Sequence, residues 1–295
     1  MRLRLILIAP AVLVFATACR EKTTPNPADH PRLSPNVRMQ DVTFESAALR
    51  RPMPYRVILP SQISTGQKFP VVYLLHGGGG NYRDWSNYSD VSQFAAAGLI
   101  LVMPEGESSY YVNAAERPND RFEDYIIRDL ILDVESKFPV ALGRSNRAIA
   151  GISMGGFGAI TLALKHPDRF FFVGGLSSAI DVPSRPFSIK RISQYRGHAQ
   201  IFGPWGSQTR RANDPYVLVE KSEPANVPYV YLTCGEQEGL LPANRRFATL
   251  LQKYRFNYEF HEDMGGHDWN QWNRRLPELL QALRQHFLNQ VKLNS

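Results

Sequence analysis

Residues 151 to 156 have the residue types and the spacing of a nucleophilic serine on a tight turn. They read Gly-Ile-Ser-Met-Gly-Gly, so that glycines stand two residues before and two residues after Ser153. A serine exposed on a sharp turn between a strand and a helix needs small residues at both places, because larger side chains would clash with nearby backbone. An apolar run at 147 to 152 and small or apolar residues in helical spacing at 156 to 165 flank the turn. The pattern favours a serine hydrolase over a glycine-rich turn with a solvated serine.

A serine hydroxyl is a weak nucleophile until a base removes its proton, so a histidine must reach Ser153. His267 is the candidate base, because it follows the last expected strand in the loop Met-Gly-Gly-His-Asp-Trp, whose glycines allow a close approach. His76 is the alternative, but it precedes a run of four glycines and is expected to fix that run by hydrogen bonding. The remaining histidines are expected in an N-terminal tether (His30) or in surface and packing positions (His166, His198, His261 and His286).

A carboxylate should orient the histidine. Hydrolases with this turn follow the chain order serine, acid, histidine, which places the acid after the strand expected at 229 to 233. The loop there reads Cys-Gly-Glu-Gln-Glu-Gly-Leu-Leu and holds no aspartate. Glu238 is preferred over Glu236, because the glycine beside it lets the backbone turn and the apolar pair after it would anchor the loop. The alternative is that Glu238 is solvated and that Asp181, after the preceding strand, takes the role.

Negative charge that develops on a carbonyl oxygen under attack needs hydrogen-bond donors, and backbone amides supply them without rearrangement. The amide of Met154, just after the serine, is one candidate. The second is expected in the run 77 to 80, whose four glycines leave their amides unobstructed, with Gly78 preferred and Gly79 next. A phosphate-binding loop is the alternative for this run, but the run lacks a following Lys-Ser/Thr and fits neither nucleotide fingerprint.

These residues need a scaffold, and the rest of the chain alternates strand and helix patterns. Strands are expected at 37–45, 54–59, 70–75, 99–103, 147–152, 171–176, 229–233 and 257–260, and helices at 122–138, 156–165, 243–254 and 269–289. The first two strands are expected to be antiparallel. Repeated strand and helix units predict a mostly parallel central sheet with helices on both faces, the α/β-hydrolase fold, in one domain from 37 to 295.

Residues 179 to 227 depart from this alternation, since they lack a clear period and contain several prolines. An insertion of this length in a compact domain is usually functional, so a lid or a pocket wall is expected. Its aromatic residues could line an acyl pocket or could pack the insertion onto the body, and both possibilities stay open for Phe187, Tyr195, Phe202 and Trp205.

The beginning of the chain predicts export. Two arginines precede an apolar run from 5 to 18, whose small last residues stand before Cys19. This run predicts a signal peptide over 1 to 18, which is too short for a stable membrane span. The same site resembles a bacterial lipobox, which favours lipidation of Cys19 and a membrane-anchored lipoprotein over a periplasmic or secreted protein. Residues 19 to 36 are Pro-rich and almost free of apolar residues, so they predict a tether.

Composition excludes several other classes of protein. At 295 residues with 43% hydrophobic content, the chain can bury the core of a single domain. Its net charge of +7 is spread in pairs rather than tracts, so no nucleic-acid partner is expected. The second cysteine, Cys234, lies in an apolar run and is expected to be a buried thiol rather than part of a disulfide framework. No motif implies a metal or a cofactor, and the oligomeric state is left open.

Several blocks of sequence resemble the esterase D family of α/β-hydrolases, which includes tributyrin, feruloyl and acetyl xylan esterases, S-formylglutathione hydrolases and secreted mycolyltransferases. The blocks are 73–81 with Trp85, 102–104, 150–159, 212–215 and 266–269, within a span of about 40 to 290. The resemblance implies that Ser153 is the nucleophile, that His267 is the base, and that the amides of Gly78 and Met154 form the oxyanion hole. The family usually has Cys-Gly-x-x-Asp where this chain has Cys-Gly-Glu-Gln-Glu, so Glu238 looks like a longer replacement for the usual aspartate.

From these features we expect an exported serine carboxylesterase that hydrolyses short-chain acyl, acetyl or feruloyl esters of small molecules or oligosaccharides through an acyl-enzyme. The export signal argues against a cytoplasmic S-formylglutathione hydrolase. Two other functions stay open. One is acyl transfer to a sugar or lipid acceptor, and the other is a non-catalytic binding protein on a hydrolase scaffold, against which an intact serine, histidine and carboxylate argue.

Overall fold

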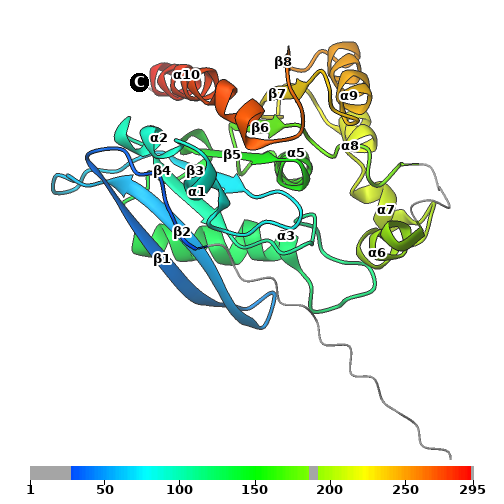
Figure 1. Ribbon diagram of the computed structural model, residues 1–295, viewed down its shortest axis with the longest axis horizontal. Coiled ribbons are helices and arrows are strands. Elements are labelled where there is room, and N and C mark those ends of the chain that lie inside the picture. The colour runs from blue at the N-terminus through cyan, green and yellow to red at the C-terminus, as the bar shows by residue number, and fades with distance from the viewer. Residues whose placement is uncertain (1–27, 186–191, 294–295) are drawn as a thin grey trace, which may run out of the picture.

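The computed structural model describes residues 28–185 and 192–293, with an eight-stranded sheet at its centre (Figure 1). The described strands lie in the order β1-β2-β4-β3-β5-β6-β7-β8. Their bounds are β1 Val37–Ser46, β2 Arg51–Pro60, β3 Val71–Leu75, β4 Ile100–Pro104, β5 Arg147–Ile152, β6 Phe172–Leu176, β7 Tyr229–Gly235 and β8 Tyr258–Asp263. β2 pairs antiparallel with both β1 and β4, and the other neighbouring pairs are parallel. The expected α/β-hydrolase fold, with two leading antiparallel strands, is confirmed.

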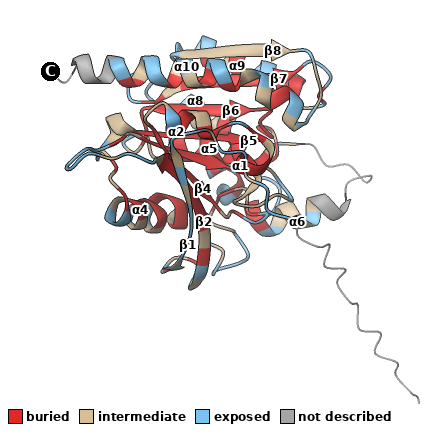
Figure 2. Ribbon diagram, turned by 60° about the vertical axis from the view of Figure 1, so that its left-hand side comes forward, coloured by how far each residue is buried: buried red, intermediate tan, exposed pale blue. Residues whose placement is uncertain are grey.

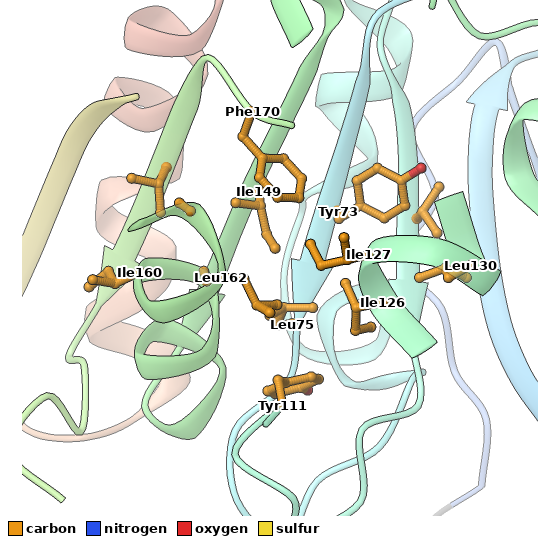
Figure 3. Packing of buried hydrophobic residues seen from close by; sticks show 14 of the residues in the cluster. Tyr73, Leu75, Tyr111, Ile126, Ile127, Leu130, Ile149, Ile160, Leu162 and Phe170 are labelled. Atoms are coloured by element: carbon orange, nitrogen blue, oxygen red, sulfur yellow. The ribbon is translucent and has the colours of Figure 1, made fainter. Parts of the chain in front are cut away.

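Helices cover both faces of the sheet, because its central strands are apolar on both sides. In β3, Val71, Tyr73 and Leu75 pack to one face, and Val72 and Leu74 pack to the other, since successive side chains of a strand point in opposite directions. Figure 3 shows Tyr73 and Leu75 against helical side chains of the first face. Buried residues are concentrated in the strands and on the sheet-facing sides of the helices (Figure 2).

The first face is covered by α3 (Phe122–Asp124), η1 (Tyr125–Leu130), α4 (Ile131–Lys137), α5 (Met154–Lys165), α8 (Pro215–Lys221) and α9 (Leu241–Lys253). The second face is covered by α1 (Asp84–Tyr88), α2 (Ser92–Ala96) and α10 (Trp269–Leu293). A short 3₁₀ turn, η2 (Arg144–Asn146), leads into β5. The helix expected at 122–138 is therefore one helical stretch whose middle, η1, has the wider turns of a π-helix.

The insertion at 179–227 contains three helices that its sequence pattern did not predict: α6 (Ile192–Phe202), α7 (Gln208–Ala212) and α8. The hydroxyl of Ser207 accepts from the Arg210 amide at the start of α7, and Asp214 caps α8 in the same way. Phe202 is buried and packs on Phe157 of α5, with 5.7 Å between ring centroids, whereas Trp205 is 52% exposed. Phe202 therefore packs the insertion against α5 of the main domain. Phe187 lies outside the described residues.

The N-terminal predictions fall mostly outside the described part of the chain, since the expected signal peptide and Cys19 precede residue 28. Residues 28–34 of the expected tether lie against the domain through hydrogen bonds to α1 and α2. Composition does not reveal this docking, because it rests on polar contacts with distant parts of the chain. Among the helices of the described residues, none is both long and apolar enough to cross a membrane. Cys234 is a buried free thiol, as expected.

Candidate active site

Ser153 lies on a strained turn between β5 and α5. Its φ of 54° and ψ of −112° are unusual for a residue with a side chain. Larger residues in place of the two flanking glycines would clash with the backbone. A Cβ on Gly151 would lie 2.3 Å from the carbonyl carbon of Gly155, and a Cβ on Gly155 would lie 2.2 Å from the carbonyl oxygen of Leu75. The turn therefore has the geometry expected from the spacing of its glycines, with the serine side chain at its tip.

His267 and Glu238 form a hydrogen-bonded path to this serine. Nε2 of His267 lies 2.9 Å from Oγ of Ser153, and Nδ1 of His267 lies 2.6 Å from Oε2 of Glu238. The imidazole comes from the loop between β8 and α10, and the carboxylate comes from the loop after β7. The side chain of Glu238 is fully buried, whereas that of His267 is 40% exposed. The histidine can therefore meet a ligand while its partner stays shielded from water.

The other carboxylate oxygen of Glu238 is held by two further donors. Oε1 accepts from the hydroxyl of Ser177 at 2.6 Å and from the amide of Gly235 at 2.8 Å. The hydroxyl of Ser177 in turn accepts from Nε1 of Trp272 at 2.8 Å. Both carboxylate oxygens thus have donors, which suits a buried negative charge. No motif in the sequence pointed to Ser177 or Trp272, because their roles depend on contacts between strands and helices far apart in the chain.

Among the contacts of the described residues, neither the two alternative carboxylates from the sequence nor the one next to His267 bonds to its ring. Glu236 is exposed, and Asp181 pairs with Arg185 at 2.5 Å. Asp268, the neighbour of His267, accepts from the amide of Gln271 and so caps the start of α10. Of these four carboxylates, Glu238 is therefore the one that contacts His267.

The glycine run lies beside the nucleophile. The amide of Gly80 donates to the carbonyl of Gly77 at 3.2 Å, and Gly79 has a φ of 76°, so the run forms a type II turn. A Cβ on Gly78 would lie 3.9 Å from Cβ of Met154. Among the contacts within the described residues, the amides of Gly78 and Met154 have no acceptor. Two free donors thus stand next to Ser153, where an oxyanion would need them.

Buried side chains hold this glycine run in place. Nδ1 of His76 lies 2.8 Å from the carbonyl oxygen of Gly77, and its Nε2 accepts from the amide of Gly106 at 2.9 Å. The hydroxyl of Tyr111 donates to the carbonyl of His76 at 3.1 Å, and Trp85 donates to the carbonyl of Leu75 at 3.0 Å. His76 therefore has the fixing contacts expected from its place before the glycines. Tyr111 was not predicted, since only the folded chain brings it to this run.

The arrangement can carry out nucleophilic attack on a carbonyl carbon. It combines a hydroxyl, a base within hydrogen-bond distance, a buried carboxylate behind the base and two amide donors. Within residues 28–185 and 192–293, no group of three or more His, Cys, Asp or Glu side chains is arranged to hold a metal ion.

Comparison with known proteins gives consistent matches. Residues 46–283 match the model of a family described as "Putative esterase". An acetyl esterase of Caldicellulosiruptor saccharolyticus is 28% identical over 251 residues, which cover 80% of this chain and 94% of that protein. The diacylglycerol acyltransferase/mycolyltransferase Ag85A of Mycobacterium leprae is 27% identical over 75% of this chain and 76% of its own length. Among solved structures, the fluorophosphonate-binding serine hydrolase F of Staphylococcus aureus has the same fold, with a TM-score of 0.73 and 24% identity over 85% of this chain and 98% of its own.

Proposed function

The chain belongs to the putative esterase family and is a carboxylic ester hydrolase, and we propose that it works through an acyl-enzyme formed on Ser153. The observation that carries this mechanism is the continuous path of hydrogen bonds from Glu238 through His267 to the hydroxyl of Ser153. In this proposal Glu238 is the acid of the triad, and the amides of Gly78 and Met154 are the oxyanion hole.

Acylation begins when Oγ of Ser153 bonds to the carbonyl carbon of the ester and its proton passes to Nε2 of His267. The carbonyl oxygen becomes an oxyanion, which receives the N–H groups of Gly78 and Met154. Glu238 stabilises the imidazolium that forms. When the tetrahedral intermediate collapses, the bond to the alcohol breaks and the alcohol leaves with the proton from His267.

Deacylation repeats these steps with water in place of the alcohol. Water gives a proton to Nε2 of His267 and attacks the acyl carbon on Ser153. The second tetrahedral intermediate forms at the same two amides. Its collapse releases the carboxylic acid and returns the proton to the serine. The strained backbone at Ser153 supports this role, because it presents the hydroxyl without rearrangement.

Replacing the nucleophile tests the mechanism. In Ser153→Ala, hydrolysis of p-nitrophenyl acetate and labelling by a fluorophosphonate probe should both disappear, while the thermal unfolding temperature stays close to that of the wild type. Substantial turnover by this variant would move the nucleophile to another residue.

We also propose short acyl groups, acetyl above all, as the substrate class. Similarity to an acetyl esterase over most of both chains supports this choice. A series of p-nitrophenyl esters of increasing acyl length, together with feruloyl esters and acetylated sugars, tests it. A maximum of kcat/KM at long acyl chains would contradict it.

Acyl transfer to a sugar or lipid hydroxyl is a second candidate, supported by the similarity to a mycolyltransferase. The acyl-enzyme would then be resolved by an alcohol rather than by water. Adding an acceptor alcohol to the assay and measuring ester product against free acid separates the two functions.

We also propose that the protein is exported and is anchored to a membrane by a lipid on Cys19. They are supported by the apolar run before Cys19 and the small residues next to it. In the native host, wild-type protein should partition into the detergent phase of a Triton X-114 extraction, and Cys19→Ser should partition into the aqueous phase. Equal partitioning of the two proteins would argue against lipidation.

A further inference from the structure

A short segment before the first strand is fastened to the outside of the domain. We call residues 29–34 the strap; they precede the family match, which starts at residue 46. The amide of His30 donates to the side chain of Asn87 at 3.2 Å, and the amide of Arg32 donates to the carbonyl of Ser86 at 2.7 Å. The amide of Ser34 donates to the hydroxyl of Ser92 at 2.8 Å. The strap thus lies along α1 and the start of α2.

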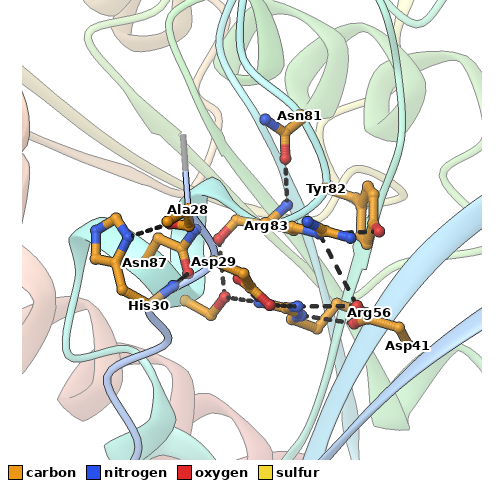
Figure 4. Close-up of polar contacts among 10 residues, drawn as sticks. Ala28, Asp29, His30, Asp41, Arg56, Asn81, Tyr82, Arg83 and Asn87 are labelled. Atoms are coloured by element: carbon orange, nitrogen blue, oxygen red, sulfur yellow. Dashed lines mark hydrogen bonds and ion pairs between the residues drawn. The ribbon is translucent and has the colours of Figure 1, made fainter. Parts of the chain in front are cut away.

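The strap is also bound to a buried guanidinium (Figure 4). Arg56 of β2 is fully buried, and its five N–H groups are all used. It forms two hydrogen bonds with Asp29 of the strap, at 2.9 and 2.6 Å, and two with Asp41 of β1, at 2.6 and 2.9 Å. Its fifth N–H group donates to the hydroxyl of Ser86 of α1 at 2.9 Å. Two-pronged carboxylate pairs of this kind are among the stronger polar contacts in proteins.

The helix under the strap, α1, follows the glycine run that carries Gly78, with only residues 81–83 between them. A Cβ on Gly80 would lie 2.0 Å from a carboxylate oxygen of Asp84, the first residue of α1, so helix and run are in close contact. Trp85, the next residue, donates to the carbonyl of Leu75 at the end of β3. Any shift of α1 would therefore move the glycine run.

The other end of α1 contacts the start of the helix that follows His267. The ring of Tyr88 lies 5.4 Å from that of His30 in the strap and 5.8 Å from that of Trp269. The side chain of Asn273 donates to the carbonyl of Tyr88 at 2.8 Å. The ring of His267 itself packs edge-on against Trp272, one turn into α10. α1 therefore lies between the glycine run and the histidine loop, and the strap covers its outer side.

We propose that the strap is a positioning element for catalysis. By holding α1 from outside, it fixes the distance between the oxyanion donor at Gly78 and the base at His267. This inference rests on the roles proposed for those two residues. It assigns Asp29 an effect on the rate of the chemical step, although Asp29 touches no reacting atom.

Asp29→Ala in the full-length chain tests the proposal. Arg56 keeps Asp41 as its counter-charge in this variant, so the fold should persist. We expect kcat for p-nitrophenyl acetate to fall by about tenfold with little change in KM, because small displacements of catalytic groups cost rate rather than binding. Asp29→Glu should restore most of the rate.

Asp90→Asn is the matched control. Asp90 pairs with Arg32 of the strap at 3.9 Å, but the side chain of Asp90 is 72% exposed, so this ion pair should contribute little. The kcat of Asp90→Asn should therefore equal that of the wild type. Tryptophan emission gives a second readout, since Trp85, Trp269 and Trp272 form one contact cluster beside Tyr88. Emission should shift to longer wavelength in Asp29→Ala only.

A lower melting temperature with unchanged kcat at 25 °C would overturn the proposal, because the strap would then act on stability alone. An equal loss of rate in Asp90→Asn would also overturn it. Failure of the serine mechanism is a separate outcome, since it would appear as full activity of Ser153→Ala, whatever the result at Asp29.

Discussion

The hydroxyl of Ser177 donates a hydrogen bond of 2.6 Å to Oε1 of Glu238, the oxygen opposite the one that contacts His267. The oxygen of Ser177 accepts from Nε1 of Trp272, so both the proton and the oxygen of this hydroxyl are used in hydrogen bonds. The contact fixes the rotation of a carboxylate that is one methylene longer than aspartate. A longer side chain has one more torsion to restrain, and Ser177 together with the Gly235 amide supplies that restraint.

Removing this hydroxyl should slow catalysis without unfolding the protein. We expect Ser177→Ala to lower kcat by roughly tenfold to a hundredfold, since hydrogen bonds to charged groups contribute about 1.5–3 kcal/mol. KM should change little, because Ser177 is buried and does not face the substrate. Ser178→Ala is the matched control, because this neighbouring serine is equally buried but its hydroxyl has no partner within the described residues. Similar rates for the two variants would show that Ser177 only fills space.

The acid itself should be identified by amide substitution. In Glu238→Gln the side chain keeps its size but cannot stabilise the imidazolium of His267, so kcat should fall by roughly a thousandfold or more. Glu236→Gln, in the same loop but exposed to solvent, should retain nearly full activity. Steady-state assays with p-nitrophenyl acetate measure both. The opposite pattern would transfer the role to Glu236 and would conflict with the hydrogen bond at 2.6 Å.

The order of the strands, the longer helices that cover the sheet and the path from Ser153 to Glu238 could be predicted from the sequence, because local patterns carry them, whereas the short helices α1 and α2 and the helices of the insertion could not. The glycines two residues before and after Ser153 indicate a tight turn, because larger side chains would clash there. The position of the acid follows from the chain order serine, acid, histidine. Ser177, Tyr111 and the strap could not be predicted in this way. Each acts through contacts with residues 27 or more positions away along the chain, and serine, tyrosine and aspartate are too common for a single occurrence to signal such a contact.

The close packing of the serine turn predicts a steep cost for a single methyl group. Gly155→Ala would place Cβ 2.2 Å from the carbonyl oxygen of Leu75 and 2.6 Å from that of His76, both backbone atoms that cannot swing away. We expect a loss of about 2–3 kcal/mol in the free energy of unfolding, measured by urea denaturation. Gly197→Ala in α6 is the control, because no atom lies within 4 Å of its added Cβ and alanine favours a helix. A Gly155→Ala variant as stable as the wild type would mean that the turn relaxes far more easily than its contacts suggest.

Glu123 should make the stability of the domain depend on pH. Burial alone would raise the pKa of this carboxyl, but its hydrogen bond with His166 and the charge of Lys165 outweigh burial and leave the pKa below its ordinary value. A carboxyl with a lower pKa in the folded state stabilises the fold above the pKa of the unfolded chain, and this contribution disappears as the pH falls through the folded pKa. Glu123→Gln should therefore cost about 2 kcal/mol at pH 7, measured by urea unfolding, and the difference from the wild type should shrink as the pH falls below about 4.5.

Glu262→Gln provides the comparison for this pH series. Glu262 also has a pKa lowered by its hydrogen bond with Arg245, but the side chains of Arg245 and Glu262 are 57% and 30% exposed to water, where ion pairs contribute little. Its substitution should change the free energy of unfolding by less than about 1 kcal/mol at any pH in the series. A difference for Glu123→Gln that stays constant from pH 7 to pH 4 would contradict the assignment, because a cost independent of protonation must come from packing rather than from the ionised carboxylate.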